Sequence, residues 1–261
     1  MKIVISAVRL LIKIIANLSK VGCYGFHAIF PKKRFRLPSE SAPLLRLANK
    51  DQIPHTLWQT NFTATVTLPV YLNYLFNRLM APSFAYRFMV TEEREKFIAE
   101  NYPDDISKAY KKLQIGASQA DFWRLLVLQK QGGIYMDIDA HLVWPLGWIL
   151  KKDLSALYLR IKSGEISNYF IASTPNNPQI TQMIALIHRN IDENKIHNVY
   201  DLTGPGVFNQ VLEGQEFATT YYRETCNQGN FTNEYFQYLD KPQGKWTKEQ
   251  QKVELIKTGF R

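Results

Sequence analysis

A helix, two glycines, a short apolar strand and two aspartates follow one another between residues 117 and 139, and this order constrains the fold most. Ala117 to Gln131 spaces its apolar side chains as a helix does, and Gly132-Gly133 is typical of a helix end. Residues 134–136 form a short apolar strand that runs into Asp137-Ile138-Asp139. The order favours an open α/β sheet, whose ligands bind at the carboxyl ends of the strands.

The spacing of the charged residues suggests what this strand end binds. Side chains two apart on an extended strand share a face, so Asp137 and Asp139 could hold one divalent cation. Mg²⁺ or Mn²⁺ held in this way neutralises the pyrophosphate that leaves a nucleoside-diphosphate sugar. Asp121 and Arg124 share a face of the preceding helix and could contact the sugar and phosphate of such a donor. A solvated ion pair is the alternative for these two residues.

The remaining body alternates strand-like and helix-like segments. Residues 53–60 and 86–90 have the pattern of strands, whereas residues 68–80 and the segment that begins at Thr91 have the pattern of helices. This alternation predicts a mostly parallel central sheet.

Positive charge is concentrated near the start of the chain. Residues 1–50 contain ten of the 32 Lys and Arg residues but one of the 23 acids, which leaves 22 of each sign in residues 51–261. A neutral body argues against a nucleic-acid partner, despite the net charge of +9. Cys23 and Cys226 are too few for a disulfide framework, which indicates a reducing compartment.

The first segment has the pattern of an amphipathic helix. Between Met1 and Val21 the polar residues recur every three or four positions and draw one narrow stripe on an otherwise apolar helix. Arg9 and Lys13 interrupt the run too early for a membrane span. We therefore expect residues 1–36 to lie on an anionic membrane surface, with packing on the domain as the alternative. Residues 37–50 contain two prolines and read as a linker, and residues 51–261 as the catalytic domain.

Four stretches of this sequence resemble a known family. Ala117-Ser118-Gln119-Ala120-Asp121-Phe122-Trp123-Arg124 and Gly132-Gly133-Ile134-Tyr135-Met136-Asp137-Ile138-Asp139 are similar to the donor-binding signature of glycosyltransferase family 32. Residues 53–59 and 203–208 resemble other segments of that family. The family includes initiating α-1,6-mannosyltransferases and bacterial capsule and lipopolysaccharide transferases.

The resemblance implies a GT-A fold and a retaining transfer from a nucleoside-diphosphate sugar to a glycan or glycolipid acceptor, with Mn²⁺ or Mg²⁺. It implies that Asp139 binds the metal directly and that Asp137 contacts both the ribose and the metal. The matched donor contacts are Trp58, Asp121, Arg124, Tyr135 and Gly204. Trp58 could stack on the nucleobase, although core packing is equally compatible with Trp58 and Tyr135. Gly204 could let the backbone approach the diphosphate or could form a tight turn.

The third metal ligand and the catalytic base stay open. Many family members carry a later His, whereas this chain has no His after His197 and offers Lys245 near the diphosphate instead. His141 would share the face of the aspartates only if the strand continued, so we expect it to be structural or to support a ligand. Two alternatives are a phosphatase-like enzyme that uses the Asp-x-Asp pair differently and a non-catalytic membrane-associated protein. We expect a peripheral location on the cytoplasmic face of a bacterial inner membrane, or on a Golgi membrane in a eukaryote.

Overall fold

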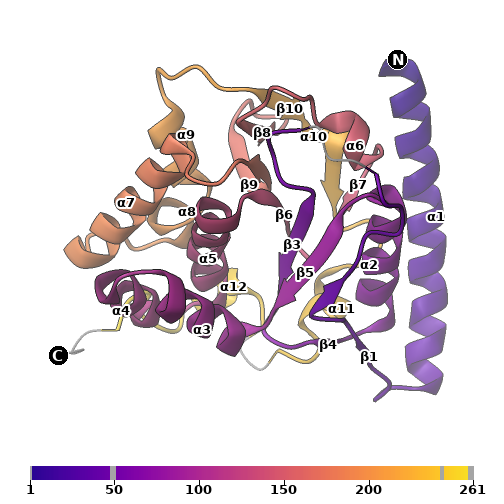
Figure 1. Ribbon diagram of the computed structural model, residues 1–261. Coiled ribbons are helices and arrows are strands. Elements are labelled where there is room, and N and C mark those ends of the chain that lie inside the picture. Colours follow the sequence, from indigo (N-terminus) through magenta and orange to yellow (C-terminus); the bar gives the residue numbers. More distant parts are fainter. Residues whose placement is uncertain (1, 48–50, 242–243, 258–261) are drawn as a thin grey trace.

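The computed structural model describes residues 2–47, 51–241 and 244–257, and they form helices on both faces of one mixed sheet (Figure 1). The strand order is β10-β8-β9-β6-β3-β5-β2. The strands are β2 (Glu40–Ser41), β3 (Thr56–Thr60), β5 (Ala85–Met89), β6 (Gly133–Met136), β8 (Ala156–Arg160), β9 (Ile166–Ser173) and β10 (Thr219–Tyr221). Two short antiparallel ladders lie beside it, β1 (Phe35–Arg36) with β4 (Thr65–Val66) and β7 (Ala140–Leu142) with β11 (Cys226–Gln228).

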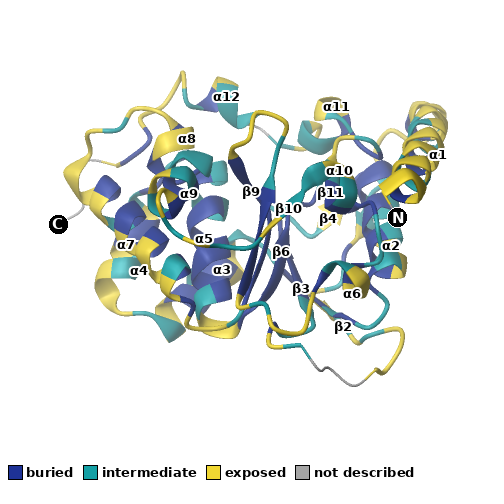
Figure 2. Ribbon diagram, turned by 90° about the horizontal axis from the view of Figure 1, so that it is seen from above, coloured by how far each residue is buried: buried dark blue, intermediate teal, exposed yellow. Residues whose placement is uncertain are grey.

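Two layers of helices cover the sheet, as the dark interior of Figure 2 shows. One layer contains α3 (Thr91–Asn101), α4 (Asp104–Lys112), α5 (Gly116–Gln131), α7 (Pro178–Glu193), α8 (Val199–Leu202) and α9 (Pro205–Leu212). The other contains α1 (Lys2–Ile29), α2 (Leu68–Met80), α6 (Leu146–Ile149), α10 (Tyr222–Thr225) and α11 (Glu234–Tyr238). The short α12 (Trp246–Glu249) packs against the first layer.

Alternating strand residues supply the two halves of the core. Trp58 and Tyr135, which are paired across β3 and β6, face the layer of α5 and α7. Their neighbours Leu57 and Ile134 face the layer of α2. Successive residues of a strand face opposite helix layers, and both layers are packed core. Each central strand is therefore apolar on both faces.

The structure confirms the expected α/β class and only part of the expected parallel sheet. Three strand pairs are parallel, namely β10 with β8, β6 with β3, and β3 with β5. The other three pairs are antiparallel, because β9 runs against both of its neighbours and β2 runs against β5. The sheet begins inside the segment expected to be a linker, since β2 forms its edge and Leu37 is buried. Residues 48–50 of that segment lie outside the described residues.

The helix expected at the start of the chain is α1, which runs antiparallel to α2 along one edge of the molecule (Figure 1). Five of its residues are buried against the domain: Ile5, Ile12, Ala16, Cys23 and His27. Within the described ranges, no helix combines the length and the apolar character needed to cross a membrane.

Candidate functional site

A cavity of about 540 Å³ opens where the parallel strands β3, β5 and β6 end. Its walls come from the loop after β3, the first turns of α3 and α5, the start of β9, and residues within 199–205, 228–241 and 245–246. Open α/β sheets bind their ligands at this edge, so the fold places a site where the sequence analysis expected one.

The glycine pair fixes how α5 joins β6. Gly132 and Gly133 have φ angles of +63° and +107°, a region that side chains disfavour. A Cβ on Gly133 would lie 2.6 Å from the carbonyl oxygen of Thr56. The two glycines therefore let β6 pair closely with β3 and let α5 turn back over it, which brings residues 121–124 next to the end of β6.

Asp137 and Asp139 lie at the floor of the cavity, but not on an extended strand. β6 ends at Met136, and the amide of Ala140 donates to the carbonyl of Asp137 (3.0 Å), which closes a turn. The expected shared strand face is therefore wrong. The carboxylates still converge, because the side-chain amide nitrogen of Gln228 donates to Asp137 Oδ2 (3.1 Å) and to Asp139 Oδ1 (3.2 Å).

Asp121 and Arg124 form a buried pair beside the aspartates, not the solvated pair that was the alternative. Arg124 Nη2 lies 2.7 Å from Asp121 Oδ1, and Nη1 lies 3.3 Å from Asp137 Oδ1. Asn168 and Thr203 donate to the two oxygens of Asp121, at 2.9 and 3.3 Å. One guanidinium thus links the helix carboxylate to the carboxylate pair.

Tyr135 belongs to the same network. Its hydroxyl donates to Asp137 Oδ1 (2.7 Å), and the Arg124 guanidinium lies 4.3 Å from its ring centroid. The hydroxyl of Tyr135 orients Asp137, and its ring packs against the guanidinium of Arg124. It lines the cavity, and its contact with a donor stays a prediction.

Enclosure changes the acidity of two of the carboxyl groups. Burial, reinforced by the charge of Asp137, raises the pKa of Asp139 to about 7. Burial also raises the pKa of Asp121 to about 7, although Arg124 opposes the shift. Both carboxyl groups therefore lie in surroundings that disfavour their ionised form.

Trp58 does not line the cavity. Its ring lies in the core, edge-on to Trp123 at 6.4 Å, and its indole N–H donates to the carbonyl of Gly132 (2.9 Å). This geometry fits core packing, the alternative that the sequence left open, and does not fit nucleobase stacking.

We therefore expect Trp58→Phe to act on stability and not on donor binding. Loss of the hydrogen bond to Gly132 and of ring volume should lower the free energy of unfolding by about 1–3 kcal/mol, measured by urea denaturation. The KM for a nucleotide-sugar donor should stay within about twofold, because no cavity wall changes. An unchanged stability with a tenfold higher KM would restore the stacking role.

Gly204 lines the cavity and precedes α9. A Cβ there would meet the carbonyl oxygen of Tyr200 at 3.0 Å, so close packing between α8 and α9 explains the glycine. His141 is buried on β7, where its ring packs against Phe76 and Phe231. Burial lowers its pKa to about 4, and a neutral core histidine agrees with the expected structural role.

The sequence analysis missed several cavity residues, among them Gln228, Asn168, Arg94 and Lys241. Gln228 and Lys241 come from segments more than 90 residues beyond Asp137, and no local pattern marks them. Arg94 is buried, and its Nε has no partner among the residues that the structure describes. Lys241 pairs with the buried Glu249 (3.1 Å), whereas Lys245, the proposed diphosphate contact, also lines the cavity and pairs with Glu234 (3.2 Å).

The carboxylate pair suits a hard divalent cation. Mg²⁺ commonly takes one or two protein carboxylates and completes its shell with substrate phosphates and water. Over residues 2–47, 51–241 and 244–257, no cluster of three or more Asp, Glu, His or Cys side chains could hold a metal alone. Asp137 and Asp139 would therefore hold a cation together with a phosphate-bearing ligand.

Known proteins that are similar to this chain include glycosyltransferases. Residues 69–156 match the family described as a glycosyltransferase sugar-binding region containing a DXD motif. The initiation-specific α-1,6-mannosyltransferase of Schizosaccharomyces pombe is 27% identical over 61% of this chain and 48% of the relative. A toxin of Photorhabdus asymbiotica is 35% identical over 50% of this chain and 4% of the toxin.

A solved structure, the PaToxG glycosyltransferase, has the same fold with a TM-score of 0.52 and 21% identity over 77% of this chain and 79% of that one. The chain spans about half the length of the S. pombe relative and 60% of the corresponding Candida albicans enzyme. The matched family region contains α5, β6 and both motif aspartates. Over residues 69–156 the chain is therefore similar to glycosyltransferases that carry this DXD sugar-binding region, in agreement with its resemblance to family 32.

Proposed function

We propose that this protein transfers a sugar from a nucleoside-diphosphate donor to a glycan or glycolipid acceptor, with Mn²⁺ or Mg²⁺ bound at Asp137 and Asp139 and with retention of configuration at the anomeric carbon. One observation carries the proposal. Both carboxylates converge on a single amide group at the floor of a large cavity, and the buried Asp121–Arg124 pair lies beside them. A metal-dependent sugar transfer needs neighbouring sites for a cation, for the diphosphate of the donor and for its sugar, in this order.

The residues have separate tasks in this scheme. A bound cation would neutralise the departing diphosphate. Asp121 lines the cavity and would accept hydrogen bonds from sugar hydroxyls. Arg124 holds Asp121 and Asp137 in place and adds positive charge near the leaving group. Tyr135 fixes the rotamer of Asp137.

The position of Gln228 bears on cation binding. Its amide N–H₂ occupies the space between the two carboxylates and satisfies both. A cation would take over this role, and rotation of the Gln228 amide would then turn its oxygen toward the metal. This side chain is our candidate for the additional protein ligand that the sequence left open.

For the biological setting, we extend the proposal to capsular polysaccharide or lipopolysaccharide synthesis at the cytoplasmic face of a bacterial inner membrane. It is supported by the basic, amphipathic start of the chain and by the family resemblance. A Golgi membrane is the corresponding place in a eukaryote.

The test is a panel of UDP-, GDP- and CMP-sugars, each with and without Mn²⁺. We expect one class of donor to raise the melting temperature only when metal is present, since a ligand at about 100 times its Kd stabilises the native state by about 2.7 kcal/mol. The same donor should be slowly hydrolysed. Absence of both effects for every donor would contradict the proposal, and metal-dependent hydrolysis of simple phosphomonoesters would favour the phosphatase-like alternative.

A further inference from the structure

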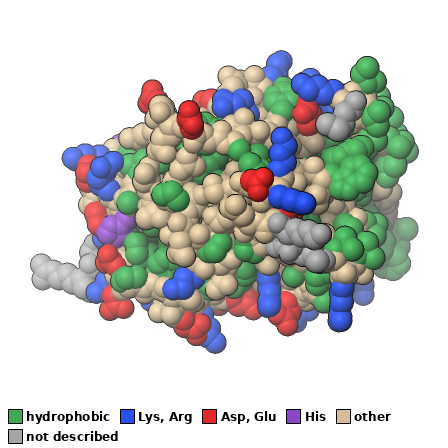
Figure 3. Space-filling model, turned by 45° about the horizontal axis from the view of Figure 1, so that its top comes forward, with side chains coloured by type: hydrophobic (Ala, Val, Ile, Leu, Met, Phe, Trp, Pro, Cys, Tyr) green, Lys and Arg blue, Asp and Glu red, His purple; other side chains and the backbone are tan. Residues whose placement is uncertain are grey.

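The outer face of α1 is apolar and uncovered. Its exposed side chains include Ile3 (85% exposed), Leu11 (57%), Leu18 (68%) and Val21 (69%). They recur at helical spacing on the side opposite Ile5, Ile12 and Ala16, which pack on the domain. Figure 3 shows hydrophobic side chains gathered along this edge of the molecule. A helix packed only as a structural element would not need apolar side chains on both faces.

Other segments extend this apolar surface near the N-terminal end of α1. Leu79 at the end of α2 is 70% exposed, and Trp148 on α6 is 75% exposed. Leu45 is also exposed, and its amide donates to the carbonyl of Pro82 (2.8 Å), which follows α2. Figure 1 places α6 on the same side of the molecule as the N-terminal end of α1. Segments far apart in sequence thus carry exposed large apolar side chains.

The positive charge around α1 indicates which kind of partner its apolar face would bind. Residues 1–36 contain eight Lys and Arg residues and no acid. Lys2, Lys13, Lys32 and Lys33 are exposed beside or beyond the apolar face. Cations that border an apolar helix face match a bilayer with anionic headgroups, where the apolar side chains enter the acyl boundary and the cations meet the lipid phosphates.

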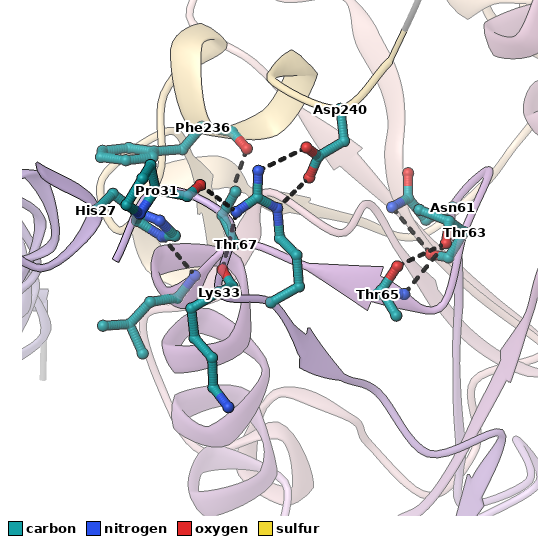
Figure 4. A network of polar contacts seen from close by, with 11 residues as sticks. His27, Pro31, Lys33, Asn61, Thr63, Thr65, Thr67, Phe236 and Asp240 are labelled. Carbon is teal, nitrogen blue, oxygen red and sulfur yellow. Dashed lines mark hydrogen bonds and ion pairs between the residues drawn. The ribbon is translucent and has the colours of Figure 1, made fainter. Parts of the chain in front are cut away.

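The helix is firmly joined to the domain and to the cavity wall. Figure 4 shows its carboxyl-terminal end, where the backbone N–H of Leu68 donates to His27 Nε2 (3.1 Å) and Arg34 pairs with Asp240. Midway along, Lys20 Nζ donates to the carbonyls of Gly229 (3.1 Å) and Thr232 (3.4 Å), two residues that line the cavity. Orientation of α1 on a surface would therefore orient the cavity as well.

We propose that α1, together with Leu45, Leu79 and Trp148, forms a surface that docks flat on an anionic lipid bilayer and thereby fixes the orientation of the cavity relative to it. The occupant of the apolar face is the lipid surface itself. Where this bears on the acceptor it rests on the proposed function: the acceptor would be a lipid-linked glycan that reaches the cavity from the same bilayer. The docking surface stands independently of catalysis.

The experiment measures co-sedimentation of the full chain with phosphatidylglycerol-containing vesicles and with phosphatidylcholine vesicles. We expect binding to the anionic vesicles that weakens at high salt, and at least about tenfold weaker binding for the Leu18→Asp/Val21→Asp variant. The matched control is Val253→Asp, because Val253 is an exposed apolar residue remote from α1 and should leave binding unchanged. Point variants are used because removal of α1 would uncover the core contacts of Ile12 and Ala16.

A second measurement tests the composite surface. Trp148 fluorescence should be quenched by brominated lipid, and Trp148→Phe should lose most of the quenching. Binding without quenching at Trp148 would overturn the composite surface. Salt-insensitive binding to both kinds of vesicle would overturn the anionic partner, and a stable dimer that ignores vesicles would show that a second copy covers the face. Donor hydrolysis in solution is a separate readout, so loss of docking is distinguishable from failure of the proposed function.

Discussion

Replacing Asp139 with asparagine is expected to abolish metal-dependent sugar transfer while leaving the metal-free protein at least as stable as the wild type. Asparagine keeps the size of the side chain and an oxygen that can accept from Gln228. It removes the charge that would bind the cation, and the lost stabilisation of several kcal/mol corresponds to a fall in turnover on the order of 10³-fold. Stability should not fall, because burial already disfavours the ionised form of Asp139 and raises its pKa to about 7.

The measurement pairs donor turnover with thermal melting in the presence and absence of Mn²⁺. Asp153→Asn is the matched control, because Asp153 is an exposed carboxylate remote from the cavity lining and its loss should change neither quantity. A variant at residue 139 that keeps more than about a tenth of wild-type turnover would remove this carboxylate from the proposed mechanism.

The second large effect concerns the buried guanidinium. Arg124→Met should lower the free energy of unfolding by about 3–5 kcal/mol, because Asp121 would be left buried without its countercharge. The variant also leaves the carbonyl of Asn168 without a donor that now lies 2.6 Å away. Both losses fall in the centre of the domain, so we expect a lower urea midpoint and weak donor binding.

The loss of stability in the Arg124→Met variant should depend on pH. Burial raises the pKa of Asp121 in the folded state to about 7, against 3.8 for the free side chain, so protonation favours the folded protein. The contribution of protonated Asp121 to the free energy of unfolding is largest below pH 4 and is lost as the pH rises through 7. Arg124→Met should therefore cost more at pH 8 than at pH 5, and the added change Asp121→Asn should recover part of it. The exposed Arg189→Met serves as the control, and an equal effect from it would contradict the assignment.

Local pattern was enough to predict the elements that carry most of the site. Residues 68–80 form the expected helix α2, and the helix over residues 117–131 and the strand after it occur where the glycine pair indicated. Asp121, Arg124 and Asp137 meet because α5 and β6 are consecutive and the two glycines fold one onto the other. Periodicity and turn chemistry act over a few residues, and these contacts depend on nothing more distant.

Contacts across the sheet could not be predicted in this way. Trp58 points into the core because β3 pairs with β6 in a register that sets Trp58 beside Tyr135, and register is a property of two strands. Gln228 reaches the aspartates because β11 pairs with β7, although 89 residues separate it from Asp139. The two-residue strand β2 is too short to show any alternation, so its segment resembled a linker.

The attachment of α1 has a consequence for how the protein is made. Lys20 and Arg34 find their partners at Gly229, Thr232 and Asp240, which are 206 to 212 residues further along. A ribosome must therefore translate nearly the whole described length before this helix can be anchored on both sides, and contacts of such wide separation form slowly. Until then the inner apolar face of α1 lacks its contact with Phe231. Any early partner, a chaperone or a bilayer, would meet α1 before the domain does.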